Sequence, residues 1–410
     1  MLKKLNRTTV NTPTRPIKVL QFGEGNFLRA FTDWVIDILN EKTDFNGNVQ
    51  VIQPIAHGMA DQVNEQEGLY HVILNGIENG KPTRSIRLIN SVTGVLNPYK
   101  DYDAFLKTAE NPDLEFIISN TTEAGIAFDE SDTSTSLPNS FPGKLTALLH
   151  HRFNHFNGDP KKALIIIPCE LIDKNGTKLR ETILQYIAHW NLSEEFKNWI
   201  EAHTTFCNTL VDRIVPGFPR ETIKDIKQEI GFEDNLVVTA EPFHLWVIEG
   251  TEEVAKKFPT GKAGLDVKFV ADQTPYRTRK VRILNGAHTA LVPVAYLKGL
   301  RTVRDSVEDE TTRAFLTKTI FEEIIPTLDL PKSELEEFAN SVLERFANPY
   351  IRHELISISL NSISKFNVRV LPSLLGYIEI KGKLPVNLVE SLAALILFYK
   401  GEYNGETIPL

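Results

Sequence analysis

A lysine, an asparagine and a histidine are spaced through the otherwise apolar stretch KVRILNGAHTA, residues 280–290. On an α-helix, Asn285 lies about 140° and His288 about 80° around the axis from Lys280, so all three share one half of the cylinder. A lysine removed from water can exchange a proton with a carbinol oxygen, while asparagine and histidine donate hydrogen bonds to a developing alkoxide. The pattern therefore suits metal-free hydride transfer. The structural alternative is a locally bonded asparagine, a core histidine and a lysine that reaches solvent.

Other reaction classes lack their motifs. No HExxH, CxxC or GxSxG spacing occurs, and two cysteines cannot form a four-ligand zinc site, so we expect no metal. A net charge of −8 without a basic tract argues against nucleic acid or a membrane surface as partner and favours a small-molecule substrate. No export signal or membrane-length apolar run is evident, so the cytoplasm is the expected location.

The second stretch with chemical potential is FGEGNFLRA, residues 22–30, where Gly23 and Gly25 lie between an apolar run and a helical pattern. In a dinucleotide-binding fold the first glycine permits the turn and the second lets backbone approach a pyrophosphate at a helix N-terminus. The third glycine position holds Leu28, and on this pattern alone a plain turn is equally plausible.

The end of the next predicted strand bears on cofactor choice. The acid that usually binds a ribose diol there is absent, and QPIAHG offers Gln53 and His57. No arginine or lysine stands there to bind a 2′-phosphate. The sequence therefore favours NAD over NADP.

The elements that must position these stretches alternate along the first two thirds of the chain. Strands are predicted at 17–22, 48–55, 114–119, 163–167 and 265–272, with helical patterns between several of them. Helical periods then dominate. We expect an α/β fold with an N-terminal Rossmann-type dinucleotide-binding domain at 1–272, followed by a mostly α-helical domain at 273–410.

Several ordered motifs together resemble one known family. They are the K-x4-N-x2-H spacing of residues 280–288, QFGEGNFLRAF at 21–31, QEGLYHV at 66–72, SNTTEAGI at 119–126, TLVDRIVPG at 209–217, EPFHLWVIEG at 241–250 and RFANPY at 345–350. The chain resembles the mannitol dehydrogenase family of polyol-specific long-chain dehydrogenases/reductases. The resemblance implies NAD-dependent hydride transfer, with the cofactor on the Rossmann domain and the substrate at a cleft with the helical domain.

The same resemblance assigns site residues. Lys280 would be the general acid in reduction and the general base in oxidation, with Asn285 and His288 polarising the carbonyl. The implied cofactor-binding residues are Gln21, Phe22, Gly23, Glu24, Gly25, Asn26, Phe27, Leu28, Arg29, Asn120, Glu123 and Asp212. Glu123 matches an acid near the nicotinamide and the proton path, and Asp212 matches a cleft position. Both are equally consistent with solvated loop carboxylates.

Departures from the polyol-oxidising members point towards an acidic substrate. Pro168–Leu171 replaces the Ser-Cys-Asp-Asn of mannitol-type members, and Arg277 stands where they tend to have glutamate. An arginine there can bind a substrate carboxylate in bidentate fashion, or it is simply solvated. Lys365 matches a basic position near the substrate, or is an exposed lysine.

The substrate implied by these matches is a hexuronate with its aldonate, as in the family's hexuronate reductases. The alternatives are a different hexuronate, or mannitol and fructose. A catalytically silent nucleotide-binding regulator would show a damaged catalytic set, whereas Lys280, Asn285 and His288 are all present.

Overall fold

The computed structural model describes residues 2–78, 80–122, 124–403 and 405–408. Within them the chain divides into two compact units. Unit 1 runs to Leu74 and continues over Ser85–Gln273, and unit 2 comprises Asn75–Arg84 and the chain from Thr274 onward. The sequence patterns did not predict that residues 75–84 belong to the second unit.

Unit 1 is built on a six-stranded sheet in which every neighbouring pair of strands is parallel. Its strands, in spatial order, are β6 (Val92–Leu96), β3 (Asn48–Ile52), β2 (Ile17–Phe22), β7 (Phe116–Ser119), β8 (Ile165–Pro168) and β9 (Thr205–Phe206). The chain thus starts in the middle, builds to one edge and then to the other. This is the order of a dinucleotide-binding sheet, whose carboxyl edge at the central switch point receives the ligand.

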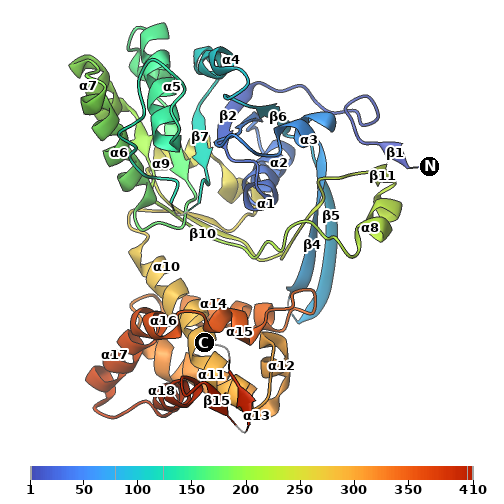
Figure 1. The fold of residues 1–410 in the computed structure, drawn as a ribbon, viewed down its shortest axis with the longest axis vertical. Helices are drawn as coiled ribbons and strands as arrows, with labels where there is room; N and C mark the ends of the chain where they lie inside the picture. The colour runs from blue at the N-terminus through green and yellow to red at the C-terminus, as the bar shows by residue number, and fades with distance from the viewer. Residues whose placement is uncertain (1, 79, 123, 404, 409–410) are drawn as a thin grey trace. The chain divides into compact units, whose positions relative to one another are not determined.

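Both faces of the sheet are buried, because successive side chains of a strand alternate between them. Val19 and Phe116 pack in one core cluster with residues of α1 (Asn26–Ala30) and α2 (Thr32–Lys42). Leu20 and Ile117 pack in the other with residues of α5 (Phe141–His155) and α6 (Asn175–His189). Figure 1 shows α5 and α6 together on one side of this sheet. The predicted α/β fold is confirmed.

Smaller elements complete unit 1. A second sheet has the order β10 (Thr209–Asp212), β13 (Leu245–Glu249), β14 (Val267–Val270), and a third has β12 (Val238–Ala240), β4 (Tyr70–Glu78), β5 (Lys81–Ile89). The parts of β4 and β5 that fall within residues 75–84 belong to unit 2. Strand β1 (Lys3–Lys4) pairs with β11 (Phe232–Glu233). The remaining helices are α3 (Ala60–Glu65), α4 (Tyr102–Lys107), α7 (Glu194–His203), α8 (Ile223–Ile230) and α9 (Glu252–Lys257), with 3-10 turns at Thr108–Glu110, Pro160–Lys162 and Thr260–Ala263.

The helical pattern after the glycine turn, expected to be continuous, is broken at Phe31. This residue has φ −122° and ψ −74°, outside the helical region, and separates α1 from α2. The break leaves the carbonyl of Ala30 without a helical partner, and Arg213 donates to it at 2.8 Å. A side chain 183 positions away therefore stabilises the break.

Unit 2 is helical, as predicted for the C-terminal part of the chain. Its α-helices are α10 (Thr274–Arg279), α11 (Gly286–Leu297), α12 (Val303–Glu308), α13 (Glu310–Lys318), α14 (Lys332–Phe346), α15 (Leu355–Ser359), α16 (Ser362–Arg369), α17 (Leu371–Lys381) and α18 (Val386–Phe398). Wider π-helical turns cover Lys280–Asn285 and Thr319–Ile324, a 3-10 turn covers Ile325–Thr327, and β15 (Glu402–Tyr403) pairs with β16 (Glu406–Thr407).

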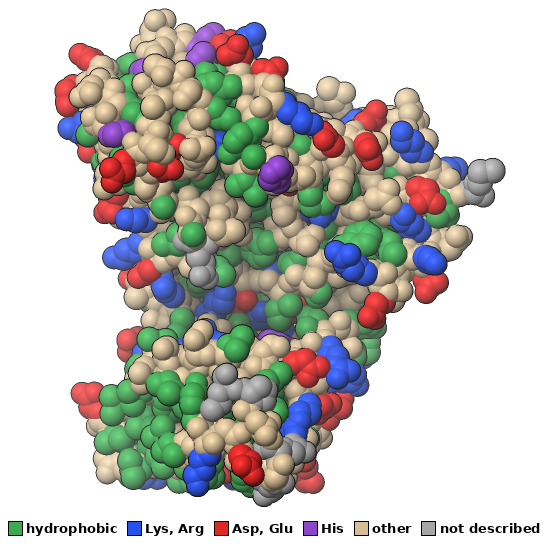
Figure 2. Space-filling model, viewed as in Figure 1, with side chains coloured by type: hydrophobic (Ala, Val, Ile, Leu, Met, Phe, Trp, Pro, Cys, Tyr) green, Lys and Arg blue, Asp and Glu red, His purple; other side chains and the backbone are tan. Residues whose placement is uncertain are grey.

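Helix α11 is the centre of unit 2. Every residue from Gly286 to Ala295 is buried, and the helix packs against α18, α15 and α16. A helix buried on all sides can be apolar all round, which explains the apolar run at 290–295. The outer helices leave large apolar side chains exposed, among them Leu375, Val386 and Ile396, and Figure 2 shows hydrophobic side chains gathered over α17 and α18.

None of the helices in the described part of the chain combines the length and the apolar character needed to cross a bilayer.

Candidate functional site

The glycine turn joins β2 to α1 at the carboxyl edge of the parallel sheet. Gly23 has φ +120°, a conformation that side chains rarely adopt. A Cβ on Gly23 would also lie 3.1 Å from the backbone oxygen of Asn120, which follows β7. Gly25 is exposed, and nothing lies within 4 Å of the Cβ it would carry. Gly23 thus lets the chain turn tightly, and Gly25 presents open backbone.

Arg29 holds this turn from within the fold. It is 3% exposed, and its Nε donates to the Glu24 carbonyl at 3.1 Å. Its Nη1 donates to the Leu236 carbonyl at 2.5 Å, and its Nη2 donates to the Asn26 side-chain oxygen at 2.7 Å. Arg29 therefore fixes Glu24 and Asn26, two other residues of the predicted cofactor set.

Gln21 belongs to a buried polar group below the turn. Its Nε2 donates to the Gly23 carbonyl at 3.1 Å and lies 3.5 Å from Asp33 Oδ2. Tyr70 donates its hydroxyl to the same aspartate oxygen at 2.7 Å. Burial raises the pKa of Asp33 to about 7. The predicted set did not include Asp33 or Tyr70.

Three further predicted cofactor residues lie in or against the apolar core. Phe22 is fully buried and Leu28 is 1% exposed. Phe27 is half-buried and stacks on Phe31, with ring centroids 4.9 Å apart. These side chains shape the turn by packing, so any contact with a ligand at Phe22 or Leu28 would fall to the backbone.

Asn120 is fixed by its neighbours at the end of β7. Its amide donates to the Phe22 carbonyl at 3.1 Å. The next residue, Thr121, donates through its amide and its hydroxyl to Glu170 Oε1, at 2.9 and 3.0 Å. Glu170 is 2% exposed and was not among the predicted site residues, although it holds the segment that carries Asn120. Glu123, which was predicted, lies outside the described residues.

Asp212 is the last residue of β10 and is 5% exposed. The segment that follows it packs on the glycine turn. Arg213 donates to the Ala30 carbonyl, and a Cβ on Gly217 would lie 2.6 Å from Asn26 Nδ2. Unit 1 therefore brings this segment and the glycine turn together.

The residues of unit 1 fit a dinucleotide. The strand order, the positive-φ Gly23 and the open backbone at Gly25 are the features that let main-chain amides meet a pyrophosphate. A side chain at Gly23 would fill the space between the turn and the end of β7. Gln21, Arg29 and Glu170 are the side chains that hold this shape.

In unit 2, Lys280 and Asn285 lie at the two ends of a π-helical turn, where a regular α-helix was expected. The Gly286 amide donates to the Val281 carbonyl five residues back, instead of four. In such a turn residues five apart become neighbours along the axis, as residues four apart do in an α-helix. Asn285 is therefore rotated towards the face of Lys280, and His288 follows one turn later in α11.

The π-helical turn is relevant to chemistry because single π-helical turns within α-helices occur frequently at functional sites. Lys280 and Asn285 are half-buried, whereas His288 is 8% exposed. Local geometry thus leaves the lysine and the amide partly exposed, and sets the histidine more deeply on the same helix.

His288 is surrounded by rings. It stacks on Phe346 with centroids 4.0 Å apart, and the edge of His353 lies across it at 5.1 Å. Burial lowers the pKa of His353. Two aromatic neighbours fix the plane of the His288 ring, and neither was predicted as a site residue, although Phe346 belongs to the RFANPY motif.

Gly286 lets another helix approach the π-turn. A Cβ there would lie 2.9 Å from the backbone oxygen of Arg369 at the end of α16. The same helix carries Lys365, whose Nζ donates to the Ile358 carbonyl at 2.8 Å. Burial, and secondarily Arg369, lower the pKa of Lys365. The predicted lysine is thus held on a helix that packs on the candidate catalytic segment.

Arg277 lies on α10, three residues before Lys280, and is half-buried. Arg279, two positions further on, forms an ion pair with Glu334 at 2.9 Å and lies 4.3 Å from the ring centre of Phe338. These two contacts hold the start of the π-turn against α14.

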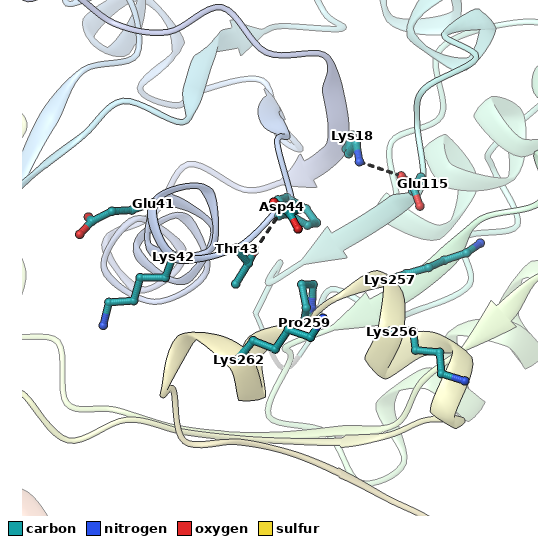
Figure 3. Close-up of a pocket in the computed structure, with 11 residues that line it drawn as sticks. Lys18, Glu41, Lys42, Thr43, Asp44, Glu115, Lys256, Lys257, Pro259 and Lys262 are labelled. Atoms are coloured by element: carbon teal, nitrogen blue, oxygen red, sulfur yellow. Dashed lines mark hydrogen bonds and ion pairs between the residues drawn. The ribbon is translucent and has the colours of Figure 1, made fainter.

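A recess of about 530 Å³ in unit 1 lies at the opposite edge of the sheet (Figure 3). Lys18 in β2 and Glu115 before β7 line it and form an ion pair at 3.3 Å. Ligands of open α/β sheets bind at the carboxyl ends of the strands, so this amino-terminal recess is not the dinucleotide site. Among the described residues, no group of three or more His, Cys, Asp or Glu side chains is arranged to hold a metal ion.

Comparison with known proteins covers the whole chain. A family model described as the mannitol dehydrogenase Rossmann domain matches residues 17–261, and one described as the mannitol dehydrogenase C-terminal domain matches residues 272–410. The altronate oxidoreductase of Phocaeicola vulgatus is 55% identical over 406 residues, which are 99% of this chain and 85% of that protein. The altronate oxidoreductase of Yersinia enterocolitica is 50% identical over 411 residues, covering 100% of this chain and 85% of that protein.

Two solved structures share the fold. The substrate-free D-sorbitol dehydrogenase structure matches with a TM-score of 0.84 at 25% identity, covering 99% of this chain and 87% of the other. The Pseudomonas fluorescens mannitol 2-dehydrogenase ternary complex with NAD and D-mannitol matches with a TM-score of 0.73 at 24% identity, covering 98% and 86%.

Proposed function

The chain belongs to the mannitol dehydrogenase family, and we propose that it is an NAD-dependent oxidoreductase that interconverts D-tagaturonate and D-altronate. The observation that carries the proposal is the 50–55% identity to altronate oxidoreductases over 99–100% of the chain. The missing basic residue after β3 supports NAD over NADP, because a 2′-phosphate would find no cation in QPIAHG.

The cofactor would be held by the glycine turn of unit 1. Its pyrophosphate would meet the backbone at Gly25, while Gly23 and Asn120 define the close approach of turn and strand. When bound, the dinucleotide supplies a hydride to the carbonyl carbon in reduction and accepts it in oxidation.

Proton transfer would fall to Lys280. In reduction its ammonium gives a proton to the carbonyl oxygen as the carbon gains the hydride, and the alcohol forms. In oxidation the neutral amine removes the hydroxyl proton. Asn285, rotated towards Lys280 by the π-turn, and His288, whose ring plane is fixed by Phe346, would stabilise the oxyanion. No step requires a metal.

Arg277 would select the acidic substrate. Its position on the helical turn before Lys280 suits a guanidinium that binds the terminal carboxylate while the carbonyl lies beside the lysine. Lys365, on the neighbouring α16, would add a second positive charge.

We expect Arg277→Glu to raise KM for the uronate about a hundredfold and to alter KM for a neutral ketose far less, since the charge reversal repels only the acid. Similar KM changes for both substrates would contradict this role.

The deciding experiment is NADH consumption with tagaturonate, fructuronate and fructose in parallel, repeated with NADPH and with EDTA. A preference for tagaturonate with NADH that EDTA leaves unchanged supports the proposal. Preference for fructuronate keeps the chemistry and changes the substrate. No turnover with any of the three would favour a nucleotide-binding protein without catalytic activity.

A further inference from the structure

The loop after β3, residues 53–59, contains no aspartate or glutamate. Its only amide side chain, that of Gln53, already forms hydrogen bonds within the loop and to α3. Gln53 donates through Nε2 to the Ile55 carbonyl at 2.8 Å, and its Oε1 accepts from the Ala60 amide at 3.2 Å. Gln53 is also 2% exposed. The residue that stands where dinucleotide folds usually place a ribose-binding acid is therefore occupied in holding its own loop.

A carboxylate reaches this loop from a different element. Glu24, between the two glycines of the turn, extends to the loop, and its Oε1 accepts from the Met59 amide at 3.1 Å. It is 8% exposed. Glu24 therefore brings a negative group to the end of β3, the place from which the expected acid is missing.

The loop is shaped to receive that carboxylate. A Cβ on Gly58 would lie 1.9 Å from Glu24 Oε1 and 2.6 Å from atoms of the Gln53 side chain. Both contacts are far below van der Waals distance, so a side chain at position 58 would displace the carboxylate. Glycine at 58 and glutamate at 24 thus form a matched pair across two separate elements.

We propose that Glu24 supplies, from the glycine turn, the carboxylate that accepts hydrogen bonds from the adenosine ribose hydroxyls and repels a 2′-phosphate. This rests on the proposed function only in requiring a dinucleotide cofactor. A ribose diol offers two hydroxyl donors to a carboxylate. A 2′-phosphate offers acceptors and like charge instead, and both disfavour its binding.

Glu24→Gln tests the idea with little change of shape. Glutamine keeps an oxygen for the Met59 amide and removes the charge. The readout is the dissociation constant, by titration calorimetry, of adenosine 5′-diphosphate and of adenosine 2′,5′-bisphosphate. We expect wild type to prefer the diphosphate and the variant to reduce that preference about tenfold or more. The kcat/KM ratio for NADH against NADPH should fall in the same direction.

Asp61→Asn is the matched control. Asp61 lies on α3, two residues beyond Met59, its side chain is 79% exposed, and it pairs with Lys100. Its substitution removes one negative charge from the same region, so a selectivity change confined to Glu24→Gln assigns the effect to the Glu24 carboxylate. Equal changes in both variants would reduce the effect to general electrostatics and overturn the proposal.

An unchanged nucleotide preference in folded Glu24→Gln protein also overturns it, and leaves Glu24 as a support for the loop. If that variant does not fold, Glu24→Asp keeps the charge and shortens the reach. It should weaken diphosphate binding while still rejecting the bisphosphate, and unchanged diphosphate binding would contradict the proposal. If the nucleotide selectivity is found but tagaturonate is not turned over, only the proposed function is refuted. If the wild-type protein binds neither nucleotide, the proposal of a dinucleotide cofactor is itself refuted.

Discussion

The glycine turn of unit 1 and the π-turn of unit 2 both depart from regular structure, and they are stabilised in opposite ways. Around the glycine turn, buried arginines hold the backbone, because Arg29 binds two carbonyls and Arg213 binds a third. Asp33 lies fully buried below them and accepts a hydrogen bond from Tyr70. The π-turn is continued by α11, which is buried along ten consecutive residues. One region is therefore fixed by charge and hydrogen bonds, and the other mainly by packing.

This difference predicts which kind of change should destabilise each region. Buried ionisable groups make stability depend on pH, because their protonation differs between the folded and unfolded chain. Close-packed helices respond instead to added volume. The candidate catalytic lysine belongs to the second region, yet it is half-buried and should contribute to the reaction more than to the fold.

The largest expected effect is on catalysis. Lys280→Met should lower kcat by about 10² to 10⁴, the range typical of a lost general acid or base. Binding of adenosine 5′-diphosphate should not change, because Gly23, Gly25 and their supports belong to unit 1. Lys332→Met, at a lysine whose side chain is 78% exposed, is the control and should leave kcat unaltered. A loss of less than a fewfold in Lys280→Met would remove the lysine from the mechanism.

A smaller effect should appear in the pH dependence of stability. The pKa of Asp33 is raised by burial from 3.8 to about 7. As pH rises from about 4 to 7 the unfolded chain releases this proton while the folded chain keeps it, so the folded state loses stability over that window. Asp33→Asn cannot titrate. The free energy of unfolding of the variant, relative to wild type, should therefore rise between these pH values by up to a few kcal/mol and then level off.

Urea unfolding at half-unit pH steps measures this difference. Asp225→Asn, at an exposed position in the first turn of α8, controls for the loss of one negative charge. A difference between Asp33→Asn and wild type that stays constant from pH 4 to 8 would show that Asp33 is ionised throughout. Burial of Asp33 would then give the glycine turn no pH-dependent stability, and the expected difference in pH response between the two regions would be lost.

Local patterns predicted the regular parts of both regions. The apolar run 17–22 coincides with β2, and the change to helical periods near residue 273 marks the start of a helical part. The run 48–55 overran β3, which ends at Ile52 because Gln53 turns into the loop and bonds to it. Strands and helices were predictable because burial of a periodic face depends mainly on nearby residues.

The departures were not predictable in the same way. The break at Phe31 depends on Arg213, and the π-turn is accompanied by a glycine that meets Arg369, so both involve residues distant in sequence. Asp33, Glu170 and His353 were missed because a single buried acid or histidine has no spacing pattern. The spacing of Lys280, Asn285 and His288 selected them, and the family resemblance assigned their roles, which stay predictions.

The smallest expected effect concerns the packing of the π-turn. Gly286→Ala would put a Cβ 2.9 Å from the Arg369 carbonyl, a backbone atom that cannot move aside alone. Overpacking of this kind typically costs about 1 to 3 kcal/mol. We expect a lower midpoint of thermal unfolding and a higher KM for the uronate, because α16 carries Lys365.

Gly376→Ala, in α17 of the same unit, would place its Cβ 3.5 Å from Thr327, an ordinary contact. It should be neutral or stabilise by about 0.4 to 1 kcal/mol. If both alanines behave alike, the approach of α16 does not constrain the π-turn, and Asn285 owes its orientation to the helix itself.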